Sequence, residues 1–341
     1  MSNINNNSKP TSPTHRLVRI DIMIGIAMLM VVLGHFSVGF EPEWYSNSLH
    51  NWIYSFHMEM FVFLSAFLIR YTYKGVYNLK DYGKYIWRKF KKFFIWFIII
   101  GITVDLIACT VKGFAFNWQY VGQSLKTLLL YPRWSEASFL WYIYILFGYY
   151  LVSPLFFKLP QIAQVICCIG AMFLAMVDGN TFLASHEFCQ YTFFYCLGVL
   201  CAQWIDEIRN VKVWLWGLLS VPFLAFSGWV FSEGLKIGFQ FPQLGWWTTV
   251  TGVTALPFFY LLSMALEKAK LTRTIFTSIS INCYWIYLLQ MFIIWGCARL
   301  VHSSIHAGTI TFTPFFFVTA ILAIAVPIFL ATLIKRFLNT K

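Results

Sequence analysis

The sequence predicts an all-α integral membrane protein with about ten transmembrane helices and both termini in the cytoplasm. Hydrophobic residues make up 59% of the 341-residue chain and charged residues only 11%, whereas a soluble domain carries about 25% charged residues. Several apolar stretches reach the roughly 20 residues that are needed to cross the hydrocarbon core of a bilayer. When these stretches are assigned as successive membrane crossings, most of the basic residues fall in the connecting segments on one side of the membrane.

The hydropathy divides the chain into a polar start and one membrane domain. Residues 1–15 are rich in Asn and Ser, so we expect a disordered cytoplasmic tail and no secretory signal. Residues 16–341 then form a multi-span domain. The predicted spans are, with soft boundaries, 20–40, 52–69, 93–111, 138–157, 161–177, 189–204, 213–231, 244–266, 276–297 and 311–334. The segment 112–137 is too polar for a span and favours an interfacial helix or a re-entrant piece.

The distribution of basic residues sets the orientation of the predicted spans. With the N-terminus inside, twenty of the 25 Lys and Arg residues fall in cytoplasmic segments. The inverted orientation would reverse this bias, which natural membrane proteins avoid. The net charge of +12 is therefore explained by topology. We expect the lipid bilayer as a partner of the chain and no nucleic acid.

The cysteines do not predict a metal site or a disulfide framework. Their positions have neither paired external locations nor the spacing of zinc ligands. Nearly all of them fall in apolar stretches, so packing residues are expected. The eight positions are Cys109, Cys167, Cys168, Cys189, Cys196, Cys201, Cys283 and Cys297.

One histidine marks a functional candidate inside the predicted membrane domain. His35 lies near the far end of the first span, directly after Gly34. A strongly polar side chain in a bilayer is costly, so it usually faces a cavity or the bundle interior. Histidine is also the side chain best suited to moving protons near neutral pH. The alternative is a histidine that only joins two helices by a hydrogen bond.

Further polar residues are expected at the same depth as His35. His57 and Glu59 lie near the outer end of the second span, and Gln290 lies in the outer half of the ninth. A short external connection makes the first two spans antiparallel neighbours, so these residues can share one cavity. Glu59 is a candidate for orienting a histidine and fixing its tautomer. The alternative for Glu59 is a carboxyl group that is neutralised by burial or paired structurally with His57.

Four stretches, in order along the chain, resemble the sequence signature of a known family. They are Asp21–Gly25 with Gly34-His35, Tyr54–Ile69 with its Phe56-His57-Met58, Phe139–Tyr142 with Tyr149-Tyr150-Leu151 and Pro154, and Ser280–Gln290. Together they resemble the acyltransferase-3 family, the membrane acetyltransferases of bacterial surface sugars, and within it the fucose 4-O-acetyltransferase-like branch. The resemblance covers about residues 16–335.

The chain departs from the family pattern at four of these positions. Ile24 stands where the family usually has Arg or Lys, and Glu59 stands where it has proline. Ala66 replaces a glycine, and Gln290 replaces a late histidine. These changes affect the expected acceptor and part of the expected donor-binding network. His35 and His57 are retained.

The resemblance implies an O-acyltransferase of the bacterial cytoplasmic membrane. Its co-substrate would be cytosolic acetyl-CoA, with no bound cofactor, and its acceptor a hydroxyl of a surface polysaccharide or lipid-linked sugar. His35 would act as general base or as transient acyl carrier. His57 or Gln290 would supply a hydrogen bond to the oxyanion or the acceptor. The family motifs add Trp141 and Asn282 as candidates for the same contacts.

A basic cluster precedes the third predicted span. Arg88, Lys89, Lys91 and Lys92 belong to the cytoplasmic segment 70–92, which carries eight basic residues. Such a cluster suits the three phosphate groups of coenzyme A. By the resemblance, Asp21 and Arg19 help to shape the donor entrance. The alternative is a polybasic loop that sets topology and contacts anionic lipid.

The remaining polar residues predict little by themselves. His186 and Glu187 fall in a predicted external loop, which favours solvated side chains over a metal site. Asp105 in the third span requires a partner that the sequence does not identify. A polysaccharide or lipid-linked-sugar exporter would explain the spans and the intramembrane charges equally well. The sequence has no internal repeat, which counts against that alternative.

Overall fold

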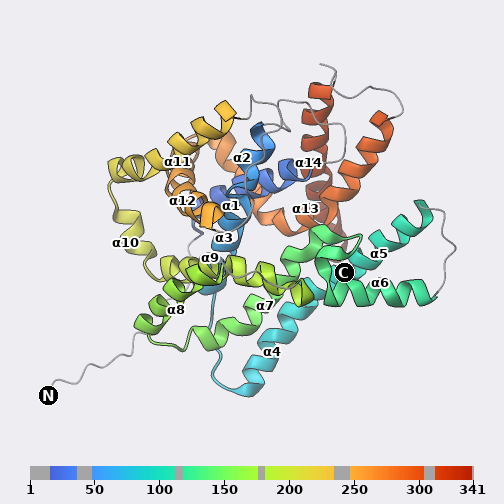
Figure 1. The fold of residues 1–341 in the computed structure, drawn as a ribbon, viewed down its shortest axis with the longest axis horizontal. Coiled ribbons are helices and arrows are strands. Elements are labelled where there is room, and N and C mark those ends of the chain that lie inside the picture. Colours follow the sequence, from blue (N-terminus) through green and yellow to red (C-terminus); the bar gives the residue numbers. More distant parts are fainter. Residues whose placement is uncertain are drawn as a thin grey trace.

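The computed structural model of the chain is a bundle of α-helices, and it describes residues 16–36, 48–111, 118–175, 181–233, 246–302 and 312–339 (Figure 1). Short helical turns, η2 (Phe90–Phe94), η3 (Pro132–Trp134), η4 (Ser138–Leu140) and η5 (Phe182–Ala184), join some of the α-helices. The α-helices are α1 (Val18–Gly34), α2 (His50–Tyr54), α3 (His57–Tyr71), α4 (Leu79–Lys89), α5 (Ile95–Val111), α6 (Trp118–Leu130), α7 (Trp141–Phe156), α8 (Gln161–Leu174), α9 (Ser185–Gln203), α10 (Ile205–Asn210), α11 (Val213–Glu233), α12 (Trp246–Leu266), α13 (Lys270–His302) and α14 (Phe312–Asn339).

Six helices among the described residues are long and apolar enough to cross a membrane, so the chain is an all-α, multi-pass membrane protein. They are α4 continued through η2 into α5, η4 with α7, α11, α12, α13 and α14. A helix also lies at each of the other predicted spans. Three of these helices are short, with 17 residues in α1, 15 in α3 and 14 in α8. Ten crossings and two cytoplasmic termini therefore stay predictions.

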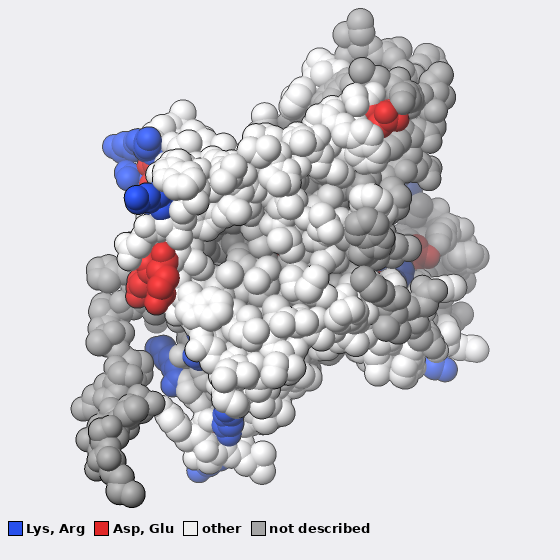
Figure 2. All heavy atoms as spheres, turned by 60° about the vertical axis from the view of Figure 1, so that its left-hand side comes forward, with Lys and Arg blue, Asp and Glu red and all other residues white. Residues whose placement is uncertain are grey.

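The shorter helices α1 and α3 lie at the centre of the bundle (Figure 1). Most of their side chains are buried, and they pack against α9, α12 and α13. The peripheral helices instead expose large apolar side chains, such as Ile162 of α8, Leu218 of α11 and Ile321 of α14. Figure 2 shows that charged residues lie toward the edges of one face and leave its middle free of them. A bilayer is the environment that such apolar walls require.

Two glycines allow the central helices to approach their neighbours closely. A Cβ atom at Gly198 of α9 would collide with the carbonyl oxygen of Phe63 on α3. A Cβ atom at Gly25 of α1 would collide with the carbonyl oxygen of Phe276 on α13. Without a hydrophobic driving force between helices in lipid, small residues at such crossings permit the backbone contact that stabilises the bundle.

Two helix ends meet inside the bundle, although both predicted spans continue through these points. The first span ends as a helix at Gly34, so that His35 follows the last turn. The second span is broken at Ser55 and Phe56, between α2 and α3. The hydroxyl of Thr251 on α12 donates a hydrogen bond to the Ser55 carbonyl at this break. The phenol of Tyr54 donates to the carbonyl oxygen of Gly34 at 3.0 Å, which joins the two ends.

The predicted cytoplasmic segment 70–92 is mostly helical rather than a loop. The side chain of Asn78 accepts a hydrogen bond of 2.8 Å from the backbone N–H of Asp81 and thereby caps the N-terminus of α4. The helix then continues through the π-helical turn η2 into α5. This continuity gives the basic residues at the end of α4 a fixed orientation relative to the bundle.

The segment 112–137, which we expected to be interfacial or re-entrant, contains α6 and the turn η3 within its described part. Most side chains of α6 are exposed to some degree. Leu128 is the exception, because it is fully buried against Gly101 of α5. The helix therefore lies along α5 as an amphipathic cover.

The close crossing of α3 and α9 generates a testable prediction. Replacing Gly198 by Ala should lower the free energy of unfolding by about 1–3 kcal/mol, because the new methyl group forces the helices apart. Gly217 of α11 is the matched control, since its Cβ position has no atom within 4 Å. Thermal unfolding in detergent micelles measures both variants. Equal midpoints for Gly198→Ala and Gly217→Ala would contradict the proposed close packing.

Candidate active site

A cavity of about 500 Å³ opens beside the two helix ends and is called the outer cavity here, after the side of the membrane predicted for it. His35, His57, Glu59 and Trp141 all line it, whereas Gln290, which we expected in the same cavity, does not. Ligand pockets in proteins have volumes of roughly 300–1,000 Å³ and few polar groups on an apolar wall. The outer cavity has such a volume, but its wall is more polar, because histidines, carboxyl groups and other hydrogen-bonding side chains line it beside the aromatic rings.

His35 occupies the C-terminal end of α1. Its backbone N–H donates to the carbonyl groups of Val31 and Val32, which holds the residue against the last helical turn. Its Nδ1 atom is buried and has no hydrogen-bond partner within the described part of the chain. The end of an α-helix carries a partial negative charge, which favours a proton on a nearby imidazole. His35 therefore has an unpaired ring nitrogen and is a residue that lines the outer cavity.

His57 occupies the N-terminal end of α3 and faces the end of α1. Its Nδ1 atom lies 2.8 Å from the carbonyl oxygen of Ile53. A carbonyl oxygen can only accept, so Nδ1 carries the proton and Nε2 keeps a lone pair in the neutral imidazole. A Cβ atom at Gly34 would lie 3.7 Å from this Nε2 atom. The two histidines are consequently neighbours across the junction of α1 and α3.

Glu59 and Gln290 are buried next to the histidines. Glu59 is 3% exposed, and its carboxyl group contacts Thr248 of α12. Gln290 of α13 is fully buried and lies beside His35. Neither polar atom of the Gln290 amide makes a hydrogen bond within the described residues. An unpaired buried amide is costly, and the Gln290 side chain lies against His35 without lining either large polar cavity.

A second polar group lines the outer cavity and was not predicted from the sequence. Arg133, from the turn η3, forms an ion pair of 2.9 Å with Glu187, from the first turn of α9. Both residues line the cavity, together with His186 and Gln190. The interpretation of His186 and Glu187 as solvated loop residues is therefore wrong for Glu187, which is buried. The signal that would have found it is its position in the first turn of a helix, where a carboxylate is favoured.

A second cavity, of about 340 Å³, lies on the predicted cytoplasmic side and is called the inner cavity. Lys89 and Lys92 line it, three residues apart along the continuous helix that contains α4 and η2. The Lys89 ammonium group lies 4.2 Å from the ring centre of Tyr150, which also lines the cavity. Side chains spaced by three residues share one helix face. Lys89 and Lys92 of the basic cluster therefore share the helix face that lines the inner cavity, and Arg88 and Lys91 lie on another face of the helix.

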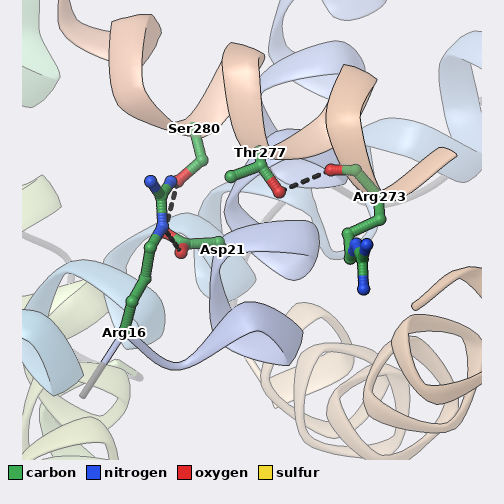
Figure 3. Close-up of polar contacts among 5 residues, drawn as sticks. All are labelled: Arg16, Asp21, Arg273, Thr277 and Ser280. Atoms are coloured by element: carbon green, nitrogen blue, oxygen red, sulfur yellow. Dashed lines mark hydrogen bonds and ion pairs between the residues drawn. The ribbon is translucent and has the colours of Figure 1, made fainter. Parts of the chain in front are cut away.

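Asp21 is linked to the wall of the inner cavity (Figure 3). Its Oδ1 atom accepts a hydrogen bond of 3.0 Å from Ser280, which lines the cavity. Its Oδ2 atom accepts from Arg16 at 2.5 Å. Figure 3 also shows Thr277 donating to the carbonyl oxygen of Arg273 on the same helix as Ser280. Asp21 therefore positions the helix end next to the cavity rather than lining it.

The other predicted site residues lie apart from both cavities. Arg19 binds Glu267, the residue directly after α12, at 2.8 Å. Lys91 lies over the ring of Trp87, and Arg88 lines neither cavity.

Asn282, expected near the acceptor, donates to the Ser278 carbonyl and accepts from Lys335 of α14. Asp105 is buried in α5 and also lies outside both cavities. No group of three or more metal-ligating side chains occurs in the described ranges.

Hydroxyl-bearing side chains link the walls of the two cavities. Tyr142 and Tyr287 line the inner cavity, and the phenol of Tyr287 bonds the carbonyl oxygen of Phe139, which lines the outer cavity. The Tyr142 hydroxyl lies 2.5 Å from that of Ser65. We call Tyr142, Tyr287 and Ser65 the tyrosine partition. We infer that it stands between the inner cavity with its lysines and the outer cavity with its histidines.

Residues 17–332 match a family described as an acyltransferase domain, of the acyltransferase-3 type. The chain belongs to the acyltransferase-3 family. With six apolar helices of spanning length, it is a membrane acyltransferase. Nodulation protein NolL of Sinorhizobium fredii (strain NBRC 101917 / NGR234) is 25% identical over 228 residues, which are 63% of this chain and 58% of that protein. The match thus spans less than two thirds of the relative. No solved structure matches the chain.

The family site generates a prediction about access from the two sides of the membrane. In a variant without the eight native cysteines, Ser138→Cys in the outer cavity should react with an impermeant maleimide added outside. Thr72→Cys in the inner cavity should react only when the reagent is added inside. Labelling of reconstituted, oriented vesicles followed by mass spectrometry measures both. Reaction of both cysteines from one side would contradict the predicted topology.

Proposed function

We propose that this acyltransferase moves an acetyl group from cytosolic acetyl-CoA to a hydroxyl of a cell-surface or lipid-linked carbohydrate. Its place would be the bacterial cytoplasmic membrane. The observation that supports the proposal is the pair of cavities, one lined by lysines and one by histidines, with a single partition between them. Donor and acceptor then approach the same partition from opposite sides.

The inner cavity suits the donor. Lys89 and Lys92 supply positive charge at its wall, and ammonium groups attract and hold phosphates. The rest of the wall is mainly apolar and aromatic, including Phe61, Leu146 and Tyr284. Such a wall accommodates the uncharged arm that carries the thioester of coenzyme A. Acetyl-CoA would be a co-substrate here, and no further cofactor is required.

The outer cavity suits the transfer step. The acceptor oxygen attacks the thioester carbonyl carbon while His35 removes the hydroxyl proton. The carbon–sulfur bond then breaks, and the proton passes from the imidazolium to the departing sulfur. The N-terminal end of α3 would stabilise the negative oxygen of the tetrahedral intermediate, and Gln290, which lies against His35, would support the imidazole or turn toward the oxygen. The carboxyl group of Glu59 would offset positive charge that develops on the imidazole of His57.

The same geometry accommodates a two-step route. In that route a ring nitrogen of His35 attacks the thioester carbonyl carbon, the carbon–sulfur bond breaks, and the coenzyme A thiolate leaves with the imidazole proton. His35 then carries the acetyl group until the acceptor oxygen displaces it. His57, with its lone pair on Nε2, would then take the proton of the acceptor hydroxyl. Both routes require that water be kept from the thioester, since hydrolysis competes with transfer. The tyrosine partition supports this exclusion.

The first test of the proposed function concerns His35. Replacing it by Ala or by Gln should lower acetyl transfer about 10²–10⁴-fold, because the base is lost. The assay follows label from radioactive acetyl-CoA into surface glycan, with purified protein in nanodiscs. Retained coenzyme A binding shows that the variant is folded. Transfer at the wild-type rate in both variants would remove His35 from the chemistry.

A second test concerns the divided basic cluster. The double variant Lys89→Gln/Lys92→Gln should weaken coenzyme A binding at least about tenfold, because two charge-assisted contacts are lost. The matched double variant Arg88→Gln/Lys91→Gln removes the same charge from the other face and should change binding less than about threefold. Equilibrium binding of radioactive coenzyme A measures both. Equal losses would favour a general polybasic surface over a defined donor cavity.

A further inference from the structure

The Arg133–Glu187 ion pair lines a part of the outer cavity that the proposed transfer step does not involve. We call this part the far end of the outer cavity. Glu187 is only 6% exposed. Its Oε1 atom accepts from Arg133, but its Oε2 atom is buried and has no hydrogen-bond partner among the described residues. Glu187 lines the cavity, and its buried carboxylate oxygen without a partner incurs a desolvation cost. A ligand hydroxyl would remove that cost by donating a hydrogen bond.

The backbone holds this pair in place from two sides. Before α9, Leu183 and Ala184 both adopt left-handed conformations, with φ of 55° and 51°. Such conformations are costly for residues with a side chain and persist only where the surroundings enforce them. The resulting sharp turn starts α9 at Ser185, and Glu187 follows in its first turn. The positive end of the helix then stabilises the carboxylate.

Arg133 is fixed by contacts that leave its charge in the cavity. Its guanidinium carbon lies 5.2 Å from the ring centre of Trp141. Trp141 in turn stacks on Tyr191 of α9, with ring centres 5.4 Å apart. The positive charge is near enough to act electrostatically on His35 and on Tyr54. The pair therefore belongs to the same space as the proposed base.

The charges that line the outer cavity select against an anionic ligand. Arg133 is the cation among the described lining residues, and Glu187 already neutralises it. Glu59 is the remaining carboxyl group, and the histidines complete the set of titratable groups with Tyr54 and Tyr191. A carboxylate or phosphate on the reacting ring would meet Glu187 without an uncompensated cation. An uncharged ring meets only hydrogen-bonding groups and aromatic faces.

We propose that the far end of the outer cavity is a subsite for an uncharged, hydroxyl-rich sugar ring, which Glu187 binds by accepting a hydrogen bond through Oε2. Gln190 offers a second hydrogen-bonding group, and the aromatic wall packs against the apolar face of the ring. Arg133 acts as a positioning residue, because it holds the carboxylate in one orientation. The inference rests on the proposed function in naming this ring as the acetyl acceptor.

The test compares two glycosides that differ only in charge. Methyl galactoside and methyl galacturonoside have the same ring, but the second carries a carboxylate at C6. Saturation-transfer NMR on the protein in nanodiscs measures their binding without any need for catalysis. We expect the wild-type protein to bind the galactoside, or its 6-deoxy relative methyl fucoside, at least about tenfold more tightly than the galacturonoside.

Glu187→Gln is the decisive variant, because it keeps the size of the side chain and removes its charge. It should weaken binding of the neutral glycoside at least about tenfold, as expected for a hydrogen bond to a charged group. Glu136→Gln is the matched control: Glu136 is exposed, lies near the same turn and lines a different groove. It should leave binding within about twofold of the wild type.

The outcomes separate the subsite from the proposed function. Acetyl transfer with a raised acceptor KM in Glu187→Gln supports both. Binding of the neutral glycoside that depends on Glu187, with no consumption of acetyl-CoA, supports the subsite and removes the proposed transfer. Equal binding of the two galactose derivatives, unchanged binding in Glu187→Gln, or no binding of any of the three glycosides overturns the subsite.

Discussion

The structure depends on the meeting of two helix ends inside an apolar bundle. The C-terminal end of α1 and the N-terminal end of α3 carry opposite partial charges. Tyr54 joins them by bonding the Gly34 carbonyl, and Thr251 bonds the broken backbone at Ser55. Each end presents one histidine. The backbone itself therefore brings the two histidines together, and the surrounding side chains hold the junction in place.

Much of this arrangement follows from the sequence, because a bilayer imposes strong constraints on composition. The helical class, the approximate limits of the spans and the convergence of His35, His57 and Glu59 could all be predicted. The break before His57 could not, because no glycine or proline marks it. It is stabilised by Thr251, which is almost two hundred residues further along the chain. Local patterns do not contain such a contact.

The candidate site shows the same division between local and distant information. The spacing of Lys89 and Lys92 predicts that they share a helix face, once α4 is known to be helical. The pairing of Arg133 with Glu187 depends on the left-handed turn at Leu183 and Ala184. Neither residue type favours that conformation, so the sequence does not predict the turn. The hydropathy begins the span at residue 189 and leaves Glu187 in the preceding loop. Tertiary packing here overrides the local preference.

The tyrosine partition has a consequence for the cell as well as for the reaction. A membrane that stores energy as an electrochemical gradient cannot tolerate a continuous file of water through one of its proteins. Two cavities that open on opposite faces, as the sequence predicts, would bring this danger close. The phenol groups bonded to Ser65 and to the Phe139 carbonyl would then interrupt such a file with fixed hydrogen bonds. Under the proposed function, these bonds would keep the membrane an insulator during transfer.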